Sequence, residues 1–228
     1  MSAIAGEPRL ALFDLDGTLL TGDTDELWCE FLMDEGVLER SVFARRNAEV
    51  AERYSRGDIG PAEFCAFYAS TLAGRSPAGW SPLRARFVDE VVAPRIGAAA
   101  HALVARHAAA GDRLVLTTAT NRFLVEPVAE RLGITPLIAT ELESADGVFT
   151  GRNAGVLNMR EGKRARLSRW LADVGLAEQA IAQAVFYSDS INDLPLLQAV
   201  GHPVAVDPDP RLRREAEQLG WPIVTLAR

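Results

Sequence analysis

The chain has 228 residues, a formal net charge of -7, 48% hydrophobic residues and a mean hydropathy of +0.04. This composition is typical of a globular protein and excludes disordered, fibrous and membrane-embedded classes. The acidic excess argues against nucleic acid or an anionic membrane as a partner. No apolar run approaches the roughly 18 residues of a membrane span. The length suits one large domain or a domain with an insert.

The start of the chain, Met1 to Pro8, has neither a basic region nor an apolar core, so we expect no secretory signal and a cytoplasmic protein. Cys29 and Cys65 lie in apolar runs with helical spacing and are expected to be buried thiols rather than a disulfide framework. The histidines have no metal-ligand spacing and are expected to be structural: His101, His107 and His202.

An apolar run from Leu10 to Phe13 predicts a strand that is buried on both faces of a parallel sheet. Asp16-Gly17 then predicts a turn at the carboxyl end of that strand, where open α/β sheets bind ligands. In extended backbone the side chains of Asp14 and Asp16 leave on the same side and can address one ligand. Two close carboxylates repel each other, and Mg²⁺ is a suitable counter-ion. The alternative is a solvated turn at a strand end.

Helical spacing replaces the strand pattern between residues of about 21 and 94. Helices are predicted over residues 26–33, 43–54, 61–72 and 83–92. The aromatic residues of this stretch are explained by core packing. We expect an all-helical cap over residues 21–94, inserted into an α/β core of residues 1–20 and 95–228.

From Ile96 onward, strands alternate with helices, which predicts parallel βαβ units. Strands are predicted over residues 113–118, 137–140, 184–187, 204–206 and 223–225. Helices are predicted over residues 96–110, 123–132, 161–174, 194–200 and 210–219. Asp146-Gly147 predicts a β-hairpin turn. The fold class is therefore α/β, with a doubly wound, Rossmann-like, mostly parallel sheet and an inserted helical cap.

Side chains that could bind a ligand or take part in catalysis follow several predicted strands or begin a predicted helix. They are Asp14 and Asp16, then Thr118, then Lys163, and finally Asp189, Asn192 and Asp193. On a doubly wound sheet such strand ends converge, so we expect one site. The carboxylates could hold a metal ion. A metal ion, a hydroxyl and a lysine together stabilise phosphate oxygens.

The run Asp14-Leu15-Asp16-Gly17-Thr18 resembles the D-x-D-G-T signature of the haloacid dehalogenase-like phosphohydrolases. The resemblance covers the whole chain, and the helical insert is similar to the cap of the phosphoserine-phosphatase-like branch. Within that branch, three stretches look most like bacterial histidinol-phosphate phosphatases: residues 118–123, 187–197 and 201–208.

The resemblance implies roles for individual residues. Asp14 would be the nucleophile that forms an aspartyl phosphate, and Asp16 the general acid and base. Thr118 would supply the hydroxyl of the second motif, with the adjacent Thr117 left open, and Lys163 would be the third motif. Mg²⁺ is the implied cofactor, and its implied ligand set is Asp14, Asp16 (through its backbone carbonyl), Asp189 and Asp193, the last of which could instead orient Lys163.

The implied substrate is a small phosphomonoester, with histidinol phosphate preferred and phosphoserine as the alternative. Asp23, nine residues after the nucleophile, is expected to hold a substrate ammonium group, although it could simply cap the following helix. The expected substrate-binding set is Asp23, Thr18, Ala119, Asn121, Arg122 and Asn192.

Other classes remain open: a non-enzymatic phospho-acceptor such as a receiver domain, a phosphomutase of the same superfamily, and an inactive binding module. A receiver is about half this size and does not carry its phospho-acceptor on the first strand. An inactive module is expected to lack Asp14 or Asp16, and both are present. A monomer or a homodimer is expected, and the helical insert is expected to move as a lid about its two crossings into the core.

Overall fold

The computed structural model describes residues 8–226, so most of the Met1 to Pro8 stretch lies outside the described residues. Its centre is a seven-stranded sheet with the order β4-β3-β2-β1-β5-β6-β7. All neighbouring strands are parallel except β3 and β4. The strands are β1 (Leu10–Phe13), β2 (Arg113–Asn121), β3 (Leu137–Ala145), β4 (Val148–Ala154), β5 (Val185–Ser188), β6 (His202–Val206) and β7 (Ile223–Val224). The predicted mostly parallel α/β fold is confirmed.

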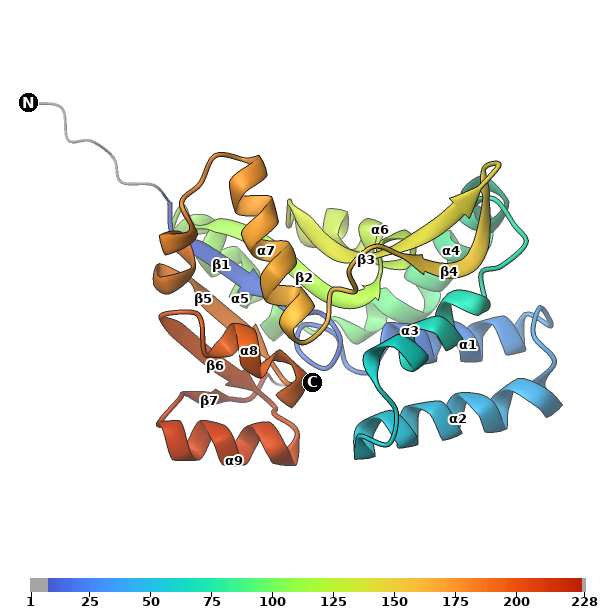
Figure 1. Ribbon diagram of the computed structural model, residues 1–228, viewed down its shortest axis with the longest axis horizontal. Coiled ribbons are helices and arrows are strands. Elements are labelled where there is room, and N and C mark those ends of the chain that lie inside the picture. Colours follow the sequence, from blue (N-terminus) through green and yellow to red (C-terminus); the bar gives the residue numbers. More distant parts are fainter. Residues whose placement is uncertain (1–7, 227–228) are drawn as a thin grey trace, which may run out of the picture.

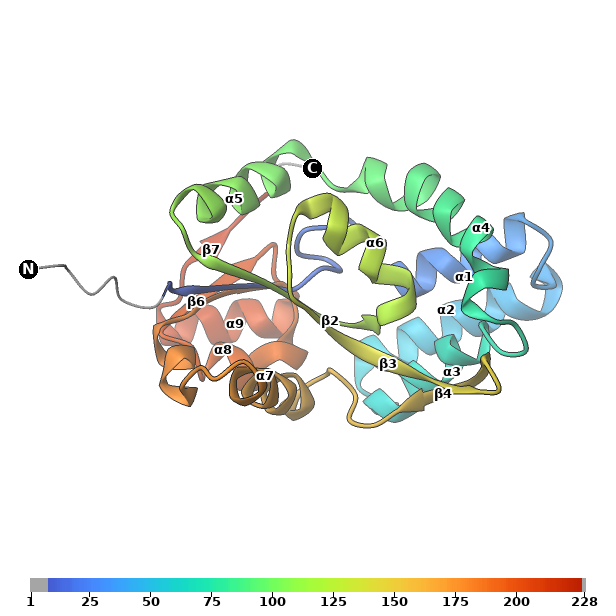
Figure 2. The same ribbon diagram turned by 90° about the horizontal axis from the view of Figure 1, so that it is seen from above.

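Helices cover both faces of this sheet (Figure 2). Phe13 of β1 packs into one apolar core with α5 (Ala98–Ala109) and α6 (Arg122–Leu132). Leu12 packs into the other core. That second core is formed with α7 (Glu161–Asp173), α8 (Leu194–Leu197) and α9 (Pro210–Leu219). Since β1 is buried on both faces in the middle of the sheet, its carboxyl end has a fixed position.

Several predicted boundaries were wrong. The strand β2 continues to Asn121, and β3 continues to Ala145 because it pairs with β4 in a hairpin. The predicted hairpin turn is confirmed: Asp146 and Gly147 both have positive φ, 51° and 76°, as a two-residue type I′ turn requires. The helix predicted over residues 83–92 is α4 (Pro77–Phe87) followed by a π-helical turn over Val88–Val92.

The earlier start of α4 has a local cause. The Ser76 hydroxyl accepts a hydrogen bond from the backbone N–H of Gly79, and proline occupies the first helical position. Both are features of a helix start.

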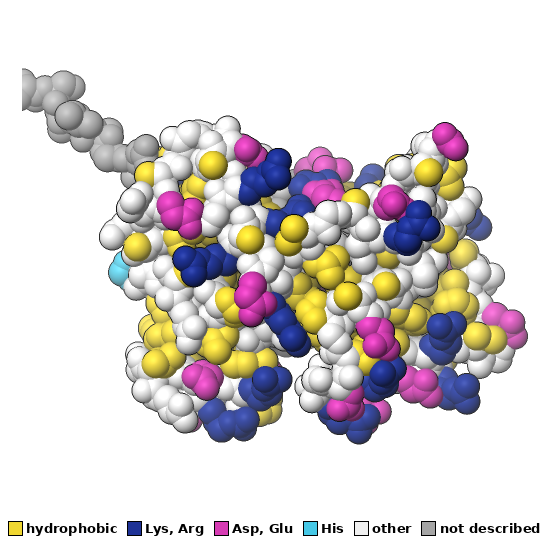
Figure 3. All heavy atoms as spheres, in the orientation of Figure 1, with side chains coloured by type: hydrophobic (Ala, Val, Ile, Leu, Met, Phe, Trp, Pro, Cys, Tyr) yellow, Lys and Arg dark blue, Asp and Glu magenta, His cyan; other side chains and the backbone are white. Residues whose placement is uncertain are grey.

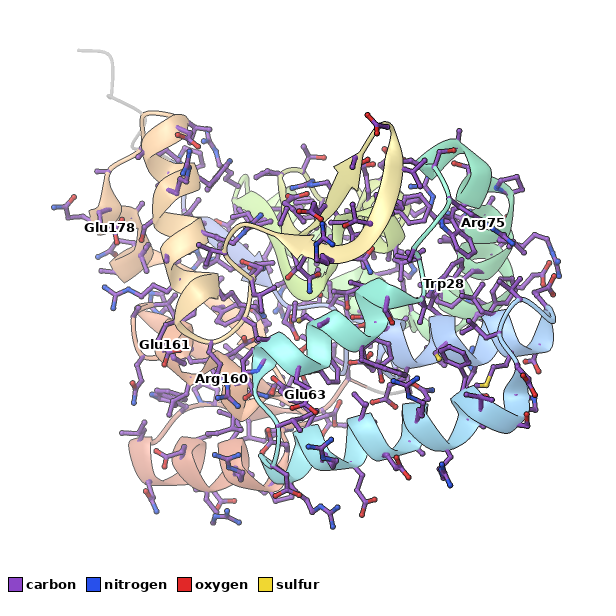
Figure 4. All side chains as sticks on the ribbon, turned by 45° about the vertical axis from the view of Figure 1, so that its right-hand side comes forward. Trp28, Glu63, Arg75, Arg160, Glu161 and Glu178 are labelled. Atoms are coloured by element: carbon purple, nitrogen blue, oxygen red, sulfur yellow. The ribbon has the colours of Figure 1, made fainter. Side chains whose placement is uncertain are left out.

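The helices α1 (Thr24–Asp34), α2 (Arg40–Arg56), α3 (Pro61–Ser70) and α4 lie between β1 and α5 in the chain and beside the sheet in space (Figure 1). Trp28 packs against Trp80 and Phe87, with ring centroids 5.8 and 5.1 Å away. Figure 4 places Trp28 well apart from Arg160 at the start of α7. Core packing therefore accounts for Trp28, as expected.

The insert is also tied to the sheet away from its two crossings. Gly74 donates a backbone hydrogen bond to Phe149 of β4, and Phe149 donates one to Arg75. Arg84 of α4 donates to the carbonyl of Phe123 in α6. These contacts fix α4, so we expect any lid movement to be confined to α2 and the start of α3. The division into core and cap stays a prediction.

No helix among residues 8–226 has the length and apolar character needed to cross a membrane. Cys29 and Cys65 are both buried free thiols, as predicted. Burial raises the pKa of Cys29 to about 12, so its thiolate is scarce at neutral pH. His107 is buried with its ring nitrogens 2.7 Å from an oxygen of Asp112 and 2.9 Å from the hydroxyl of Tyr187, which fits a structural role.

Candidate active site

A buried charge triad, formed by Asp14, Lys163 and Asp193, lies at the carboxyl end of β1. The Lys163 ammonium group, at the start of α7, donates to Asp14 Oδ1 at 2.9 Å and to Asp193 Oδ2 at 2.7 Å. The Ser188 hydroxyl also donates to Asp193 Oδ2 at 2.7 Å. All four side chains are buried. Asp193 therefore orients Lys163, which in turn faces Asp14.

Burial dominates the electrostatics of this triad. It raises the pKa of Asp14 well above its usual range, and although Lys163 opposes that shift, the charges of Asp193 and Asp189 add to it. Burial alone would lower the pKa of Lys163, but Asp14 and Asp193 reverse the effect and raise it. The surroundings therefore favour the charged form of Lys163, and this charge only partly offsets the cost of burying a charge on Asp14.

The turn after β1 brings Asp189 beside Asp14. The Thr18 hydroxyl lies 3.5 Å from Asp14 Oδ2 and 3.1 Å from Asp189 Oδ1, and it accepts the backbone N–H of Asp189 at 3.0 Å. Gly17 has φ +72°, and a Cβ at this residue would lie 2.0 Å from Asp189 Oδ2. The turn therefore requires glycine both for its backbone conformation and for the approach of Asp189.

We expect Gly17→Ala to displace Asp189 and lower turnover by about 10² or more, since a small misplacement of a reacting group has effects of this size. Gly175→Ala is the matched control, because Gly175 has the same φ of +72° and a Cβ at this residue would have no neighbour within 4 Å. Steady-state phosphatase assays and urea unfolding separate the two effects. Both variants are expected to lose about 1 kcal/mol of stability or more from the strained backbone. Equal turnover in the two variants would contradict the assigned role of Gly17.

The Asp16 carboxylate is held by three threonines. The backbone N–H of Thr24 donates to Asp16 Oδ1 at 2.8 Å, and the Thr24 hydroxyl bonds to the same oxygen. The hydroxyls of Thr118 and Thr120 donate to Asp16 Oδ2 at 3.2 and 2.7 Å. The hydroxyl of Thr117 instead accepts from Asn158. Thr118, rather than its neighbour, therefore faces the site.

A cavity of about 370 Å³ opens over these groups. Figure 3 shows a notch in the lower outline of the molecule, between the positions that α9 and α2 occupy in Figure 1. The predicted site residues that line the cavity are Asp14, Asp16, Asp23, Thr118, Ala119, Lys163, Asp189, Asn192 and Asp193. The ends of β1, β2 and β5, the start of α7 and the helical insert thus contribute to one cavity.

Three predicted substrate-binding residues lie elsewhere. Thr18 sits behind Asp14 and Asp189 and bonds to both. Asn121 donates to Asp25 at 3.2 Å and caps α6. Arg122 binds Glu141 with distances of 3.0 and 3.1 Å and lines a different groove. The extension of β2 to Asn121 explains the difference, because it turns Arg122 away from the cavity.

Asp23 caps α1: its Oδ1 accepts the backbone N–H groups of Asp25 and Glu26 at 2.9 and 3.0 Å. The capping alternative is thus realised, yet Asp23 also lines the cavity, as does Asp25. Burial raises the pKa of both carboxyls, and the negative charge of Asp16 raises each further. A ligand cation placed here would relieve this repulsion.

The residues around Asp14 and Asp189 fit a magnesium ion. Burial and the charge of Asp193 raise the pKa of Asp189 to about 7, so Lys163 does not fully offset the negative charge of these paired carboxylates. Oxygen donors of this kind are the ligands that Mg²⁺ prefers. Among residues 8–226 no three His, Cys, Asp or Glu side chains form a metal-binding group. The Asp16 carboxylate is bonded to threonines, and the Asp193 carboxylate to Lys163 and Ser188. Asp193 is therefore not available as a metal ligand, and Asp16 could bind the ion only through its backbone carbonyl.

Several residues at the site were not predicted from the sequence. Thr24 and Thr120 hold Asp16, while Asn158 donates to the carbonyls of Thr118 and Ile138 at 2.8 and 2.9 Å. Hydroxyl residues flanking the two motifs are the signal that could have found the threonines. No local pattern in the sequence marks Asn158.

The family model described as haloacid dehalogenase-like hydrolase matches residues 11–198. The chain belongs to this family. The match runs from β1 past Asp193, so it includes every element that contributes a carboxylate or lysine to the charge triad of the haloacid dehalogenase-like site.

Individual relatives extend this result. The chain is 38% identical to the histidinol-phosphatase of Neisseria meningitidis serogroup C, over 95% of this chain and 98% of the relative. It is 32% identical to the phosphoserine phosphatase SerB1 of Mycobacterium tuberculosis, over 93% of this chain and 69% of that one. A crystal structure of a protein of unknown function from Bordetella pertussis Tohama I superposes with a TM-score of 0.91 and 42% identity, covering 96% of this chain and 99% of that one.

Proposed function

We propose that this haloacid dehalogenase-like hydrolase is a phosphatase that cleaves a small phosphomonoester, histidinol phosphate, through an aspartyl phosphate on Asp14. The observation that carries the proposal is the buried contact of Lys163 with Asp14 and Asp193 at the end of the central strand. This contact puts a fixed cation beside the Asp14 carboxylate, which is the nucleophile in this proposal, with Asp16 two residues further on.

The chemistry needs two displacements at phosphorus. An Asp14 carboxylate oxygen attacks phosphorus as the bond to the ester oxygen breaks, and Asp16 gives a proton to the departing alkoxide. Asp16 then takes a proton from water, whose oxygen attacks phosphorus and releases phosphate and the Asp14 carboxylate. In this proposal, Lys163 and the Thr118 hydroxyl turn to the phosphoryl oxygens when the substrate is bound and stabilise them.

Asp14, Asp189 and the backbone carbonyl of Asp16 would hold Mg²⁺. When bound, the ion would offset the repulsion between these carboxylates and the substrate phosphate. Thr18 contributes by fixing Asp14 and Asp189 relative to each other through its hydroxyl.

The charges of the cavity support an amino alcohol phosphate rather than phosphoserine. Among the described residues that line the cavity, Lys163 is the one basic side chain, and it is engaged by two carboxylates. A substrate carboxylate would thus find no free cation, whereas a substrate amine would find Asp23 and Asp25. Histidinol phosphate has the amine and no carboxylate. The similarity to a histidinol-phosphatase favours the same substrate.

We expect Asp23→Asn to lower kcat/KM for histidinol phosphate by about tenfold or more and to spare p-nitrophenyl phosphate, because only the first substrate carries an amine. Asparagine caps helices about as well as aspartate, so α1 is expected to remain intact. Steady-state kinetics on both esters provide the measurement. Equal losses on the two substrates would assign Asp23 to capping alone.

The proposed function is tested by phosphate release over a panel of phosphomonoesters, each with Mg²⁺ and with a chelator. Histidinol phosphate is expected to be the best substrate, and turnover is expected to require the metal. Faster turnover of phosphoserine would support the alternative substrate, and no release from any ester would refute the proposal.

A further inference from the structure

The cavity has an apolar wall that the phosphoryl chemistry does not use. Tyr54 comes from the last turn of α2, Phe64 from the first turn of α3, and Met159 from the segment before α7. These residues lie far apart in the chain but pack in one apolar cluster. The helical insert and the sheet domain thus build this wall together.

Contacts within the wall fix the ring of Tyr54. Its centroid lies 4.2 Å from that of Phe64, with an angle of 32° between the ring planes. Its hydroxyl lies 3.2 Å from the sulfur of Met159. Phe64 and Met159 are 4% and 8% exposed, whereas Tyr54 is half-buried, so Tyr54 keeps accessible surface at the cavity. A thioether is a weak acceptor, and this hydroxyl is therefore available to a ligand.

The backbone next to Met159 is held in an unusual conformation. Arg160 has φ 53° and ψ -128°, a region that side-chain-bearing residues rarely adopt. Its Nε donates to the Asn192 side-chain oxygen at 3.1 Å, which ties this segment to the loop after β5. Figure 4 shows Arg160 where the start of α7 approaches the start of α3. The position of Met159 is thus set by a strained residue that the surrounding structure holds in place.

The charge of the cavity selects what this wall can bind. Six carboxylates line it, from Asp14, Asp16, Asp23, Asp25, Asp189 and Asp193. Lys163 is the one basic group among its described lining residues. Aromatic faces stack with planar rings and attract cations. A volume of about 370 Å³ accommodates a small metabolite with such a ring.

We infer that Tyr54, Phe64 and Met159 form a ring subsite that binds a planar, basic heteroaromatic group of the substrate, and that Tyr54 determines specificity for this group. The inference rests on the proposed function for the phosphate end of the same substrate. The imidazole of histidinol phosphate belongs to this chemical class. Phosphoserine and other phosphorylated amino alcohols without a ring leave the subsite unfilled.

The test measures binding without turnover. Histidinol and alaninol share an amino alcohol, but only histidinol carries a ring. Their affinities are measured by NMR titration for the wild type, Tyr54→Leu and Phe43→Leu. Phe43 is the matched control, because it is a partly buried aromatic residue on the same helix and outside the cavity lining. Thermal unfolding confirms that each variant is folded.

In the wild type, histidinol is expected to bind about five- to tenfold more tightly than alaninol, the effect of one stacked or cation–π contact. Tyr54→Leu is expected to remove this difference without weakening alaninol, and Phe43→Leu to preserve it. Equal affinities in the wild type, or a difference that survives Tyr54→Leu, would overturn the ring subsite.

Phosphate release from histidinol phosphate, followed on the same proteins, separates the two proposals. Ring discrimination without any phosphate release would refute the proposed function and leave the subsite supported. Phosphate release without ring discrimination would refute the ring subsite and leave the proposed function supported.

Discussion

Asp14→Asn is expected to abolish phosphate release, with a loss of about 10⁴ or more in kcat, as removal of a nucleophile does in other enzymes. The amide has nearly the same shape but cannot attack phosphorus. The protein is expected to remain folded, because burial already raises the pKa of Asp14 and disfavours its charge. Lys163 also retains Asp193 as a partner in this variant.

Asp173→Asn is a suitable control, since Asp173 is an exposed carboxylate near the end of α7, outside the cavity. Turnover by multiple-turnover phosphate assay is expected to be unchanged in the control. An Asp14→Asn protein that retained more than a few per cent of wild-type kcat would exclude Asp14 as the nucleophile.

Lys163→Met is expected to remove both activity and much of the stability. Lys163 is 2% exposed and neutralises two buried carboxylates. Loss of one partner of a buried ion pair costs about 3–5 kcal/mol, because the remaining charge stays buried and uncompensated. Urea unfolding at neutral pH measures this loss.

The destabilisation is expected to shrink as the pH falls. Without Lys163, the pKa of Asp14 in the folded protein, which burial already raises, rises further above that of the unfolded chain. Protonation in the folded state then relieves the repulsion at acidic pH, and the cost returns as the pH rises. Arg164→Met is the control, because Arg164 is the exposed neighbour on the same helix. If Lys163→Met were as stable as Arg164→Met at neutral pH, the charge triad would not stabilise the fold.

The sheet and the main catalytic candidates could be predicted from the sequence because their signals are local. The apolar run before Asp14 specifies a buried strand, and parallel strands bring their carboxyl ends to one edge. Asp14, Lys163 and Asp193 therefore meet as expected, although they are 149 and 30 residues apart in the chain.

Other parts of the site depend on tertiary placement, which no local pattern specifies. Phe64 lies in an apolar helix whose pattern indicates core packing, and only the position of α3 beside the sheet turns it toward the cavity. Asn158 lies in no predicted strand, helix or motif. The sequence pattern ends β2 at Thr118, whereas the strand continues to Asn121 and Arg122, which was expected to bind the substrate, lines another groove.

The most direct measurement is a rapid-quench experiment with histidinol phosphate and Mg²⁺, followed by mass-spectrometric mapping of the acid-trapped protein. One phosphoryl group on Asp14 is expected in the wild type and none in Asp14→Asn. A phosphoryl group on any other residue, or turnover without a phosphorylated enzyme, would contradict the assignment of Asp14 as the nucleophile.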